Sequence, residues 1–391
     1  MLDVKEIWRK KVDNYALAWS EFESKTLTPT SMPFKGIVEL TQNCNFRCIM
    51  CPQSWDPKFA KYKAEYNMPM DTFVKIAEQF FPYANFIDLR GFGETTILPW
   101  WPELVDYLEN HPFIEWHLVT NLGLPRPQTW DKMIRTGFVL GFSCDGATKD
   151  VFESIRQRSN FDTICENLKT IQDAIKKNQT GFLYFISTIQ RKNIHELRAL
   201  VEMAARYQVG EVQFKMVQPK DADQDPKKMN PDEIRLHCES AIDAALDLGV
   251  RVLFNDWTFT KGIDPKRVQA AANIDNRRSP RPFPAKPSFD PDYWEQKGMP
   301  RIFDQSIDSY RVSVNQRCFK PFSYVYINYE AKMGTCNHMM FPDMLEMGDL
   351  KKQSMREIWN SPAYQKFRSD LLLATPTDHR CQWCFKHRMD D

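Results

Sequence analysis

Three cysteines lie close together near the start of the chain, in the run Cys44-Asn-Phe-Arg-Cys48-Ile-Met-Cys51, directly after a short apolar segment. Three thiolates on one tight loop can hold three corners of a four-iron cluster, because thiolate sulfur is the usual ligand of such clusters. The fourth iron is then left without a protein ligand, and an open coordination position distinguishes a catalytic metal site from a structural one. The alternative is a zinc site, which needs a fourth Cys or His, and none lies close in sequence.

The composition is that of a globular protein, with 391 residues of which 42% are hydrophobic, enough for two or three domains. The 52 basic and 51 acidic residues nearly cancel, so we expect no nucleic-acid partner bound mainly through phosphates. The apolar runs are too short for a membrane span, and the N-terminus lacks the apolar core of an export signal. We therefore expect a cytoplasmic protein with no membrane partner, whose ten cysteines are metal ligands and core residues rather than disulfides.

The order of apolar runs predicts the fold class. Residues Leu2 to Glu23 are expected to form a helix with a broad apolar face. From Gly36 to about Phe254, strand-like runs alternate with helix-like stretches, which is typical of parallel strands joined by crossover helices. The strand-like runs are Gly36–Thr41, Asn85–Gly91, Glu115–Thr120, Val139–Ser143, Gly181–Thr188, Glu211–Met216 and Arg251–Phe254. The helix-like stretches include Asp71–Phe81, Phe161–Lys177, Ile194–Tyr207 and Asp232–Leu248. Six such units predict an α/β protein with a partial (β/α)6 barrel and functional residues at the carboxyl ends of its strands.

The rest of the chain departs from this rhythm. Residues 255–312 are rich in proline, which excludes long helices and central strands. We interpret them as a surface linker; the alternative is a lid whose Arg278 and Arg281 hold an anionic substrate. After them, β-rich runs at Tyr324–Tyr329 and Lys332–Thr335 and a helix around Met355–Leu372 predict a small α+β extension. The expected organisation is an N-terminal helical segment, a barrel, a linker or lid, and an extension, at residues 1–33, 34–254, 255–312 and 313–391.

The CxxxCxxC spacing on a loop after a first strand resembles the radical S-adenosylmethionine (radical SAM) family. The resemblance implies that the amino and carboxylate groups of SAM chelate the open iron of a 4Fe–4S cluster. It further implies reductive cleavage of SAM to a 5′-deoxyadenosyl radical, which removes a hydrogen atom from carbon. An external low-potential electron donor, such as flavodoxin or ferredoxin, is implied as a partner.

Several runs at strand ends resemble the SAM-binding motifs of the same family. The run Gly91-Phe92-Gly93-Glu94-Thr95 resembles its Gly-Gly-Glu-Pro signature, whose carbonyls accept hydrogen bonds from the SAM ammonium group. Here Phe92 separates the glycines and Thr95 replaces the proline. Thr120-Asn121 stands where the family often has Thr-Asn-Gly, and Ser143-Cys-Asp145-Gly-Ala resembles its Ser-x-Asp-Gly-Ala. The cofactor-binding residues implied by the resemblance are Met50, Gly91, Gly93, Glu94, Asn121, Ser143, Asp145 and Arg156.

Four of these positions carry specific expectations. Arg156 matches an arginine that pairs with the SAM carboxylate; the alternative is a surface ion pair. For Asp145 the alternative is an N-cap of the next helix. Met50 stands where the family usually has an aromatic residue beside the adenine. Strand alternation places Ser143 and Asp145 on one face of the sheet and Cys144 on the other.

A second group of cysteines comprises Cys318, Cys336, Cys381 and Cys384. Four soft ligands, two of them in a CxxC, fit a closed 4Fe–4S cluster or, alternatively, a zinc site. Their arrangement resembles the shortened "twitch" version of the SPASM extension of radical SAM enzymes, which carries one auxiliary cluster. A fully ligated cluster is better suited to accepting an electron than to binding substrate. With Cys44, Cys48 and Cys51, the expected metal ligands are thus seven cysteines.

Other reactive residues have plainer interpretations. Cys165 and Cys238 lie on or beside apolar helical stripes and are expected to be small core residues. Cys144, facing away from SAM, is not placed to return a hydrogen atom, as an epimerase requires. His338 either approaches the substrate as a base or completes a local hydrogen bond.

These features favour a radical SAM enzyme of the oxidoreductase type. The expected substrate is a small polar metabolite, such as a sugar or cyclitol, oxidised with the auxiliary cluster as electron acceptor. The alternatives are redox-neutral epimerisation or dehydration, and peptide modification. Many peptide-modifying relatives carry an N-terminal recognition module, whereas only 35 residues precede the first strand-like run here. A metal-stabilised binding protein without catalysis is the remaining alternative.

Overall fold

The computed structural model describes residues 3–57, 63–217, 222–274, 318–336, 344–373 and 375–387. The predictions for Arg278, Arg281 and His338 fall outside the described residues. The expected N-terminal helix is present as α1 (Val4–Glu23), with the Asp3 carboxylate accepting a hydrogen bond at its start. Across the described residues, no helix combines the length and apolar character needed to cross a membrane.

One sheet of ten strands runs through the part of the chain that is described, in the order β12-β11-β10-β1-β3-β4-β5-β7-β8-β9. The strands are β1 (Lys35–Val38), β3 (Phe86–Asp88), β4 (Glu115–Thr120), β5 (Val139–Ser143), β7 (Phe182–Ile189), β8 (Glu211–Met216), β9 (Arg251–Phe254), β10 (Tyr324–Ile327), β11 (Lys332–Gly334) and β12 (Gly348–Asp349). All neighbours from β10 to β9 pair in parallel, and β11 and β12 are antiparallel. The predicted α/β class with a parallel, partly closed sheet is confirmed.

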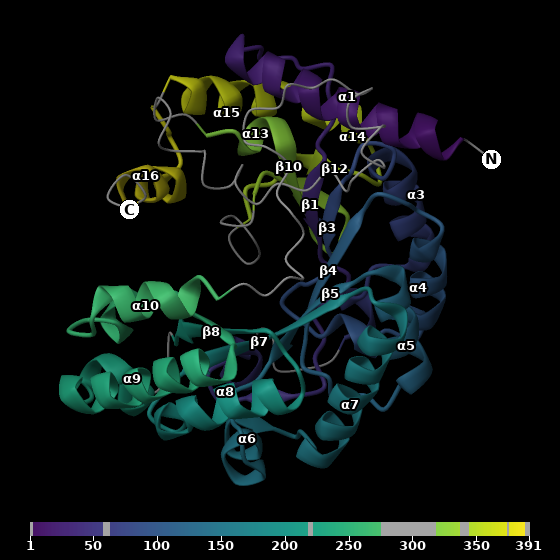
Figure 1. Cartoon of the computed structure of the whole chain (residues 1–391). Coiled ribbons are helices and arrows are strands. Elements are labelled where there is room, and N and C mark those ends of the chain that lie inside the picture. The colour runs from purple at the N-terminus through teal and green to yellow at the C-terminus, as the bar shows by residue number, and fades with distance from the viewer. Residues whose placement is uncertain are drawn as a thin grey trace.

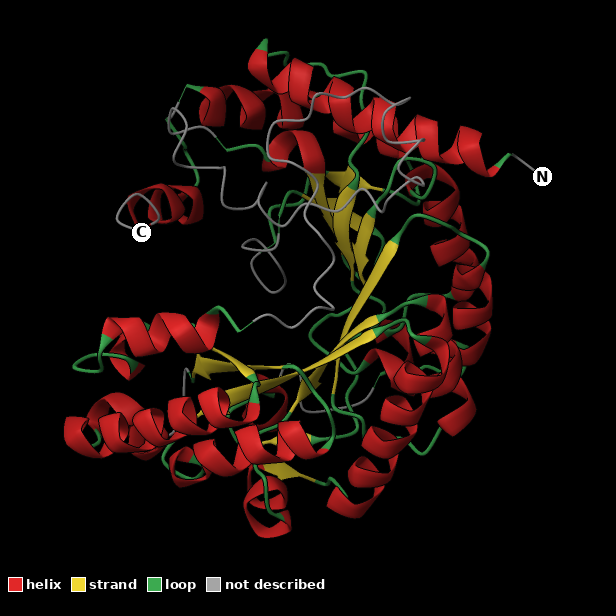
Figure 2. Ribbon diagram, in the orientation of Figure 1, coloured by secondary structure: helices red, strands yellow, loops and turns green. Residues whose placement is uncertain are grey.

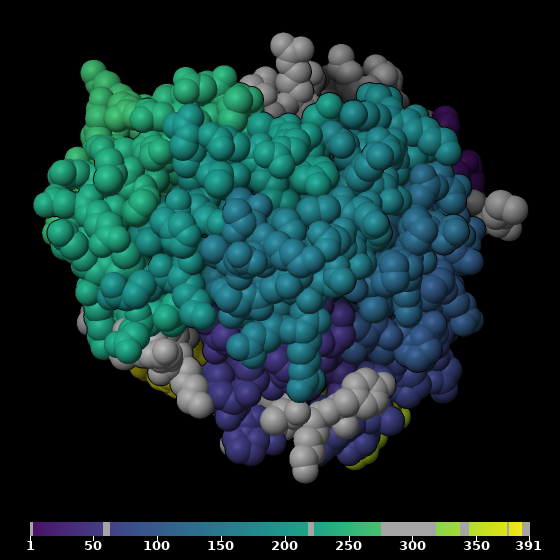
Figure 3. Space-filling model, turned by 90° about the horizontal axis from the view of Figure 1, so that it is seen from below, coloured from purple at the N-terminus to yellow at the C-terminus, as the bar shows by residue number. Residues whose placement is uncertain are grey.

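Helices cover the outer side of the curved sheet, as Figures 1 and 2 show. They are α3 (Met70–Phe80), α4 (Trp101–Glu109), α5 (Pro127–Thr136), α6 (Lys149–Ile155), α7 (Phe161–Asn178), α8 (Leu197–Arg206) and α9 (Pro231–Leu248). Seen from below, residues of the teal and green part of the chain form most of the surface (Figure 3). The outer side of the sheet is therefore closed by helices, and the polar chemistry must lie on its inner side.

Alternation along the strands separates these two sides. In β4, Trp116 and Leu118 are fully buried in the main hydrophobic core under the outer helices. Glu115 and His117 alternate with them and thus face the barrel interior. In β8, Val212 and Phe214 belong to the core and alternate with polar residues in the same way. The strands are apolar toward the helices and polar toward the interior.

The C-terminal segment joins the barrel through the sheet itself. Strand β10 pairs with β1, and Gly36 allows the close approach, because a Cβ there would lie 2.8 Å from the Val325 carbonyl oxygen. Helix α10 (Pro265–Ala272) precedes this part of the chain. The helices of the C-terminal part itself are α13 (Lys320–Ser323), α14 (Met355–Trp359), α15 (Pro362–Leu372) and α16 (His379–His387). The single helix expected at Met355–Leu372 is wrong: Ser361 caps a second helix that begins at Pro362, whose ring suits a first turn.

Helix α1 lies across the upper edge of the molecule beside α13, α14 and α15 (Figure 1). Its Phe22 packs edge-to-face on Phe319 and Phe322. The buried Lys11 donates to the carbonyl oxygens of Phe81, at 2.6 Å, and Ala84. Burial lowers the pKa of Lys11 to about 7. The helix thus fastens the extension to the first crossover of the barrel.

Candidate active site

The three-cysteine loop is held by a short two-stranded sheet. Strand β2 (Arg47–Cys48) pairs antiparallel with β6 (Arg156–Gln157), so that Cys48 faces Arg156 across the ladder. The Arg47 guanidinium donates to the carbonyl oxygens of Cys44 and Phe46 at 2.9 and 2.7 Å. Helix α2 (Pro52–Trp55) follows at once. Strand pairing and these hydrogen bonds therefore hold the loop from both ends.

The thiols on this loop are suited to a multi-iron cluster. Burial is the main cause that raises the pKa of Cys44 to about 12 and that of Cys48 to about 11. Bound iron would hold them as thiolates. Among the described residues, no three Cys, His, Asp or Glu side chains converge as ligands of one metal ion. A four-iron cluster does not need such convergence, because each thiolate binds a different iron.

Arg156 and Asp145 form a buried ion pair beside the cysteines, with 2.7 Å between Nη2 and Oδ2. The Asp145 Oδ1 accepts a hydrogen bond from the Thr188 amide at 2.6 Å, whereas α6 is capped by Thr148. The N-cap alternative for Asp145 is therefore wrong, and so is a surface pair for Arg156. Arg156 Nη1 lies 3.8 Å from Cys48 Sγ, and its buried Nε has no partner in the described part of the chain. A guanidinium with a spare donor beside the cluster loop fits the carboxylate of SAM.

The turn after β3 approaches the cysteine loop closely, as its glycines require. A Cβ on Gly93 would lie 2.3 Å from the Asn43 carbonyl oxygen. The amides of Gly93 and Glu94 donate to the carbonyls of Thr41 and Asn43 at 3.2 and 2.8 Å. Gly91 and Gly93 thus bring carbonyl groups to the edge of the cluster loop, where the resemblance expects the SAM ammonium group.

Glu94 organises this turn from inside the protein. Its Oε1 accepts hydrogen bonds from the hydroxyls of Thr96 and Thr120 at 2.7 and 2.8 Å, and its Oε2 accepts from the Asn121 amide at 2.7 Å. The Asn121 Nδ2 donates to Asn45 Oδ1 at 2.8 Å, within the cysteine loop. Glu94 therefore positions the turn and the end of β4, and Asn121 connects that end to the loop.

The remaining expected cofactor residues lie around the same centre. Met50 is half-buried against the main core, and Ser143 is half-buried at the end of β5. Cys144 is fully buried in the main core, as alternation predicts. Cys238 is also buried in the main core, and the half-buried Cys165 packs against that core. The roles of Met50 and Ser143 in SAM binding stay predictions.

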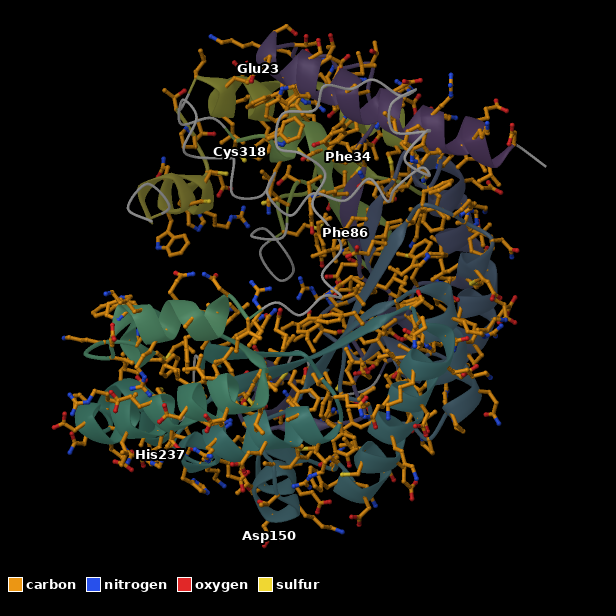
Figure 4. All side chains as sticks on the ribbon, viewed as in Figure 1. Glu23, Phe34, Phe86, Asp150, His237 and Cys318 are labelled. Atoms are coloured by element: carbon orange, nitrogen blue, oxygen red, sulfur yellow. The ribbon has the colours of Figure 1, made fainter. Side chains whose placement is uncertain are left out.

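The four cysteines of the second group lie near one another in the extension. Cys336 and Cys381 are buried in a small cluster with Ile37 and Tyr326, and Cys318 packs against it. Burial and the neighbouring Cys336, Cys318 and Cys384 raise the pKa of Cys381. Figure 4 shows Cys318 on the upper, C-terminal part of the molecule, whereas His237 and Asp150 lie on the outer helices below. The four thiols are thus near one another and apart from the first loop in sequence.

A hydrogen-bonded chain that the sequence did not predict lies inside the barrel. His117 Nδ1 lies 2.9 Å from Asp88 Oδ2, and its Nε2 lies 2.7 Å from the Tyr184 hydroxyl. Burial raises the pKa of the Tyr184 phenol, so its hydroxyl keeps a proton beside His117 Nε2, and the tautomer of His117 sets which group donates in each hydrogen bond. Gly141 on β5 leaves room for this contact, since a Cβ there would lie 2.7 Å from the Tyr184 oxygen. The alternating polar residues in the strand-like runs were the available signal.

Two cations face the same interior and were also missed. Arg90 pairs with Asp88 at 2.7 Å, and the charge of Arg90 together with the hydrogen bond from His117 lowers the pKa of Asp88, although burial opposes the change. Lys215 on β8 is half-buried, and within the described residues it has no ion pair. Burial and the charge of Arg90 lower the pKa of Lys215. Arg90 and Lys215 thus bring positive charge to an inner face that also carries the acidic Asp88, Glu115 and Glu211.

Comparison with known proteins adds to this geometry. The Radical SAM superfamily model matches residues 38–204, and that of SPASM, an iron-sulfur cluster-binding domain, matches residues 318–385. Mycofactocin maturase MftC of Mycobacterium tuberculosis is 28% identical over 172 residues, or 43% of this chain and 41% of that protein. MftC of Mycolicibacterium smegmatis is 26% identical over the same shares. The match thus spans about two fifths of the length of these curated relatives.

Solved structures share the fold at low identity. Streptococcus suis SuiB bound to S-adenosylmethionine has a TM-score of 0.57 and 12% identity, covering 87% of this chain and 68% of SuiB. The structure of anSMEcpe with bound AdoMet has a TM-score of 0.56 and 14% identity, covering 91% and 88%. The radical SAM domain implies a 4Fe–4S cluster and SAM, and the SPASM domain implies an auxiliary iron–sulfur cluster. The chain belongs to the radical SAM superfamily and carries a C-terminal SPASM domain.

Proposed function

We propose that this radical SAM enzyme removes a hydrogen atom from a peptide that enters the interior of the partial barrel. The observation that carries the substrate class is the match to MftC, a peptide-modifying maturase. The same fold is found in SuiB bound to its precursor peptide SuiA. The small polar metabolite expected from the sequence has no support in these comparisons.

The inner face of the sheet supports a substrate rich in polar groups. Arg90 and Lys215 supply positive charge, and the Asp88–His117–Tyr184 chain supplies a fixed phenol on the same side. A peptide offers carboxylate and amide oxygens to cations and carbonyl groups to donors. Because these residues come from several strands that pair in register, they form a rigid surface rather than a mobile loop.

The roles of the chain in SAM binding follow from the site. The Arg156 guanidinium would hold the carboxylate of SAM, and the carbonyls of the Gly91–Gly93 turn would accept its ammonium protons. Glu94 keeps this turn against the cysteine loop. When bound, SAM and the cluster held by Cys44, Cys48 and Cys51 supply the radical chemistry that removes hydrogen from carbon.

Net oxidation is the favoured outcome. Cys144, the cysteine next to the expected SAM contacts, is fully buried in the outer core, so it is not placed to return a hydrogen atom to the substrate. Oxidation removes one hydrogen atom and one further electron from the peptide and releases a proton. The second cysteine group is suited to hold the cluster that accepts this electron, and a flavodoxin or ferredoxin would supply the first.

The proposal is tested by measuring 5′-deoxyadenosine under strictly anaerobic conditions. The reconstituted enzyme, SAM and reductant are incubated with synthetic peptides translated from short reading frames beside its gene, or with a panel of sugars and cyclitols. We expect a peptide to raise 5′-deoxyadenosine formation above the substrate-free rate.

The matched control is Cys48→Ala, which removes one cluster ligand and should abolish SAM cleavage with every substrate. Stimulation by a sugar or cyclitol but by none of the peptides would overturn the peptide assignment. Absence of any deoxyadenosine from the wild-type protein would instead favour a binding protein without catalysis.

A further inference from the structure

Glu39, just after β1, is a fully buried carboxylate that connects two distant parts of the chain. Its Oε1 accepts a hydrogen bond from the Phe92 amide at 2.6 Å. Its Oε2 accepts one from the Tyr326 hydroxyl on β10 at 2.7 Å. The Glu39 amide also donates to the Ile327 carbonyl at 2.8 Å. Both its side chain and its backbone therefore bind the strand that opens the C-terminal extension.

The Phe92 end of this connection lies inside the turn expected to bind SAM. Gly91 packs directly on the Glu39 side chain, since a Cβ there would lie 2.2 Å from Glu39 Cγ. The opposite side of the turn is held by Gln53, whose Nε2 donates to the Phe92 carbonyl at 3.3 Å. Glu39 thus holds the amide of Phe92, and Gln53, which directly follows the cysteine loop in α2, holds its carbonyl.

The Tyr326 end lies against the second cysteine group. The Tyr326 side chain belongs to the same small cluster as the buried Cys336 and Cys381. One side chain therefore touches the surroundings of the auxiliary site with its ring and Glu39 with its hydroxyl. A shift of β10 caused at that site would move the hydroxyl, and with it the acceptor of the Phe92 amide.

A buried carboxylate is a costly way to make such a connection. Within the described residues no cation pairs with Glu39, and burial raises its pKa to about 7 despite hydrogen bonds from Phe92 and Tyr326. An apolar side chain at this position would avoid that cost, as replacements of buried charges often do. What only the carboxyl supplies is two acceptor atoms, one for each partner.

We propose that the Tyr326–Glu39 bridge is a positioning device: it sets the Gly91–Glu94 turn for SAM and couples SAM affinity to the SPASM domain. Glu39 and Tyr326 act through the Phe92 amide and do not themselves contact SAM. The inference does not depend on the substrate being a peptide, and its test uses no substrate. Failure of the peptide proposal would leave it untouched, and the reverse also holds.

The test compares Tyr326→Phe with Tyr364→Phe in reconstituted protein of equal iron content. Tyr364 is a matched control, because it is a buried tyrosine of the same domain whose hydroxyl donates to the Gly334 carbonyl at 3.4 Å, away from Glu39. Two quantities are measured: the SAM dissociation constant by equilibrium dialysis, and hydrogen exchange of the segment 88–96.

We expect Tyr326→Phe to weaken SAM binding about three- to tenfold, the range set by the net loss of one ordinary hydrogen bond. Exchange of the Phe92 amide should accelerate in the same variant, and Tyr364→Phe should change neither quantity by more than about twofold. Unchanged SAM affinity in Tyr326→Phe, or equal weakening in both variants, would overturn the proposal.

A second pair of variants tests the Glu39 end. Glu39→Gln keeps an acceptor for the Phe92 amide and a donor for the Tyr326 oxygen, so it should retain SAM affinity. Glu39→Ala keeps neither and should lose it to at least the extent of Tyr326→Phe. Equal SAM affinity in these two variants would contradict the positioning role, and the tyrosine pair decides the matter if Glu39→Ala does not fold.

Discussion

Burial of the Glu39 carboxyl predicts that the folded protein loses stability as the pH rises from 5 to 8. Its pKa is raised from 4.5 to about 7 in the fold, chiefly by desolvation. Between these two values the folded state keeps a proton that the unfolded state has lost. Stability rises with pH only where the unfolded state binds more protons, so here the free energy of unfolding falls as the pH rises.

The size of the effect follows from the shift. One pKa unit corresponds to about 1.4 kcal/mol, and the part of the shift that titrates between pH 5 and pH 8 amounts to roughly 2.5 kcal/mol. For a chain of 391 residues this is about 3 °C in the unfolding temperature, from the usual entropy of unfolding per residue.

Glu39→Gln removes the titrating group while keeping the shape and both hydrogen-bonding positions. Calorimetric scans at one rate, on anaerobic protein, should therefore show its unfolding temperature rising relative to wild type by about 3 °C between pH 5 and pH 8. The exposed Glu78 provides the control, since Glu78→Gln should follow the wild-type profile. If the difference in unfolding temperature between wild type and Glu39→Gln stayed constant with pH, the reasoning would be refuted.

Two further substitutions test the active-site geometry. Arg156→Met leaves the buried Asp145 without its cation, so it should lower the free energy of unfolding by about 3–5 kcal/mol. The control is Arg198→Met, which breaks an exposed ion pair and should lower that free energy by less than about 1 kcal/mol. Calorimetry measures both changes. Gly93→Ala places a Cβ 2.3 Å from the Asn43 carbonyl, so it should displace the cysteine loop and lower the iron bound per chain; iron equal to wild type would contradict the close approach.

Local patterns in the sequence were sufficient to predict the bounds of several barrel strands. The runs at Glu115–Thr120, Val139–Ser143, Glu211–Met216 and Arg251–Phe254 coincide with β4, β5, β8 and β9, because alternation and flanking turn residues mark their ends. The same alternation also indicates a polar barrel interior, because polar residues recur on one side of buried parallel strands.

Residue partners far apart in sequence could not be predicted in this way. The Tyr326–Glu39 hydrogen bond joins residues 287 positions apart, and it depends on β10 pairing with β1 at the edge of the barrel. Asp145 was open to an N-cap role because the sequence shows the next helix but not Arg156 folding back along Cys48. In both cases the sheet register, which no local pattern encodes, decides the contact.

The central claim is that a peptide carbon loses its hydrogen within this barrel. The most direct measurement is the mass of 5′-deoxyadenosine formed by the anaerobic enzyme from a candidate peptide with fully deuterated side chains and backbone carbons. The account predicts one deuterium in 5′-deoxyadenosine and a matching loss of deuterium from the peptide. Unlabelled 5′-deoxyadenosine, formed at the substrate-free rate with the peptide unchanged in mass, would contradict it.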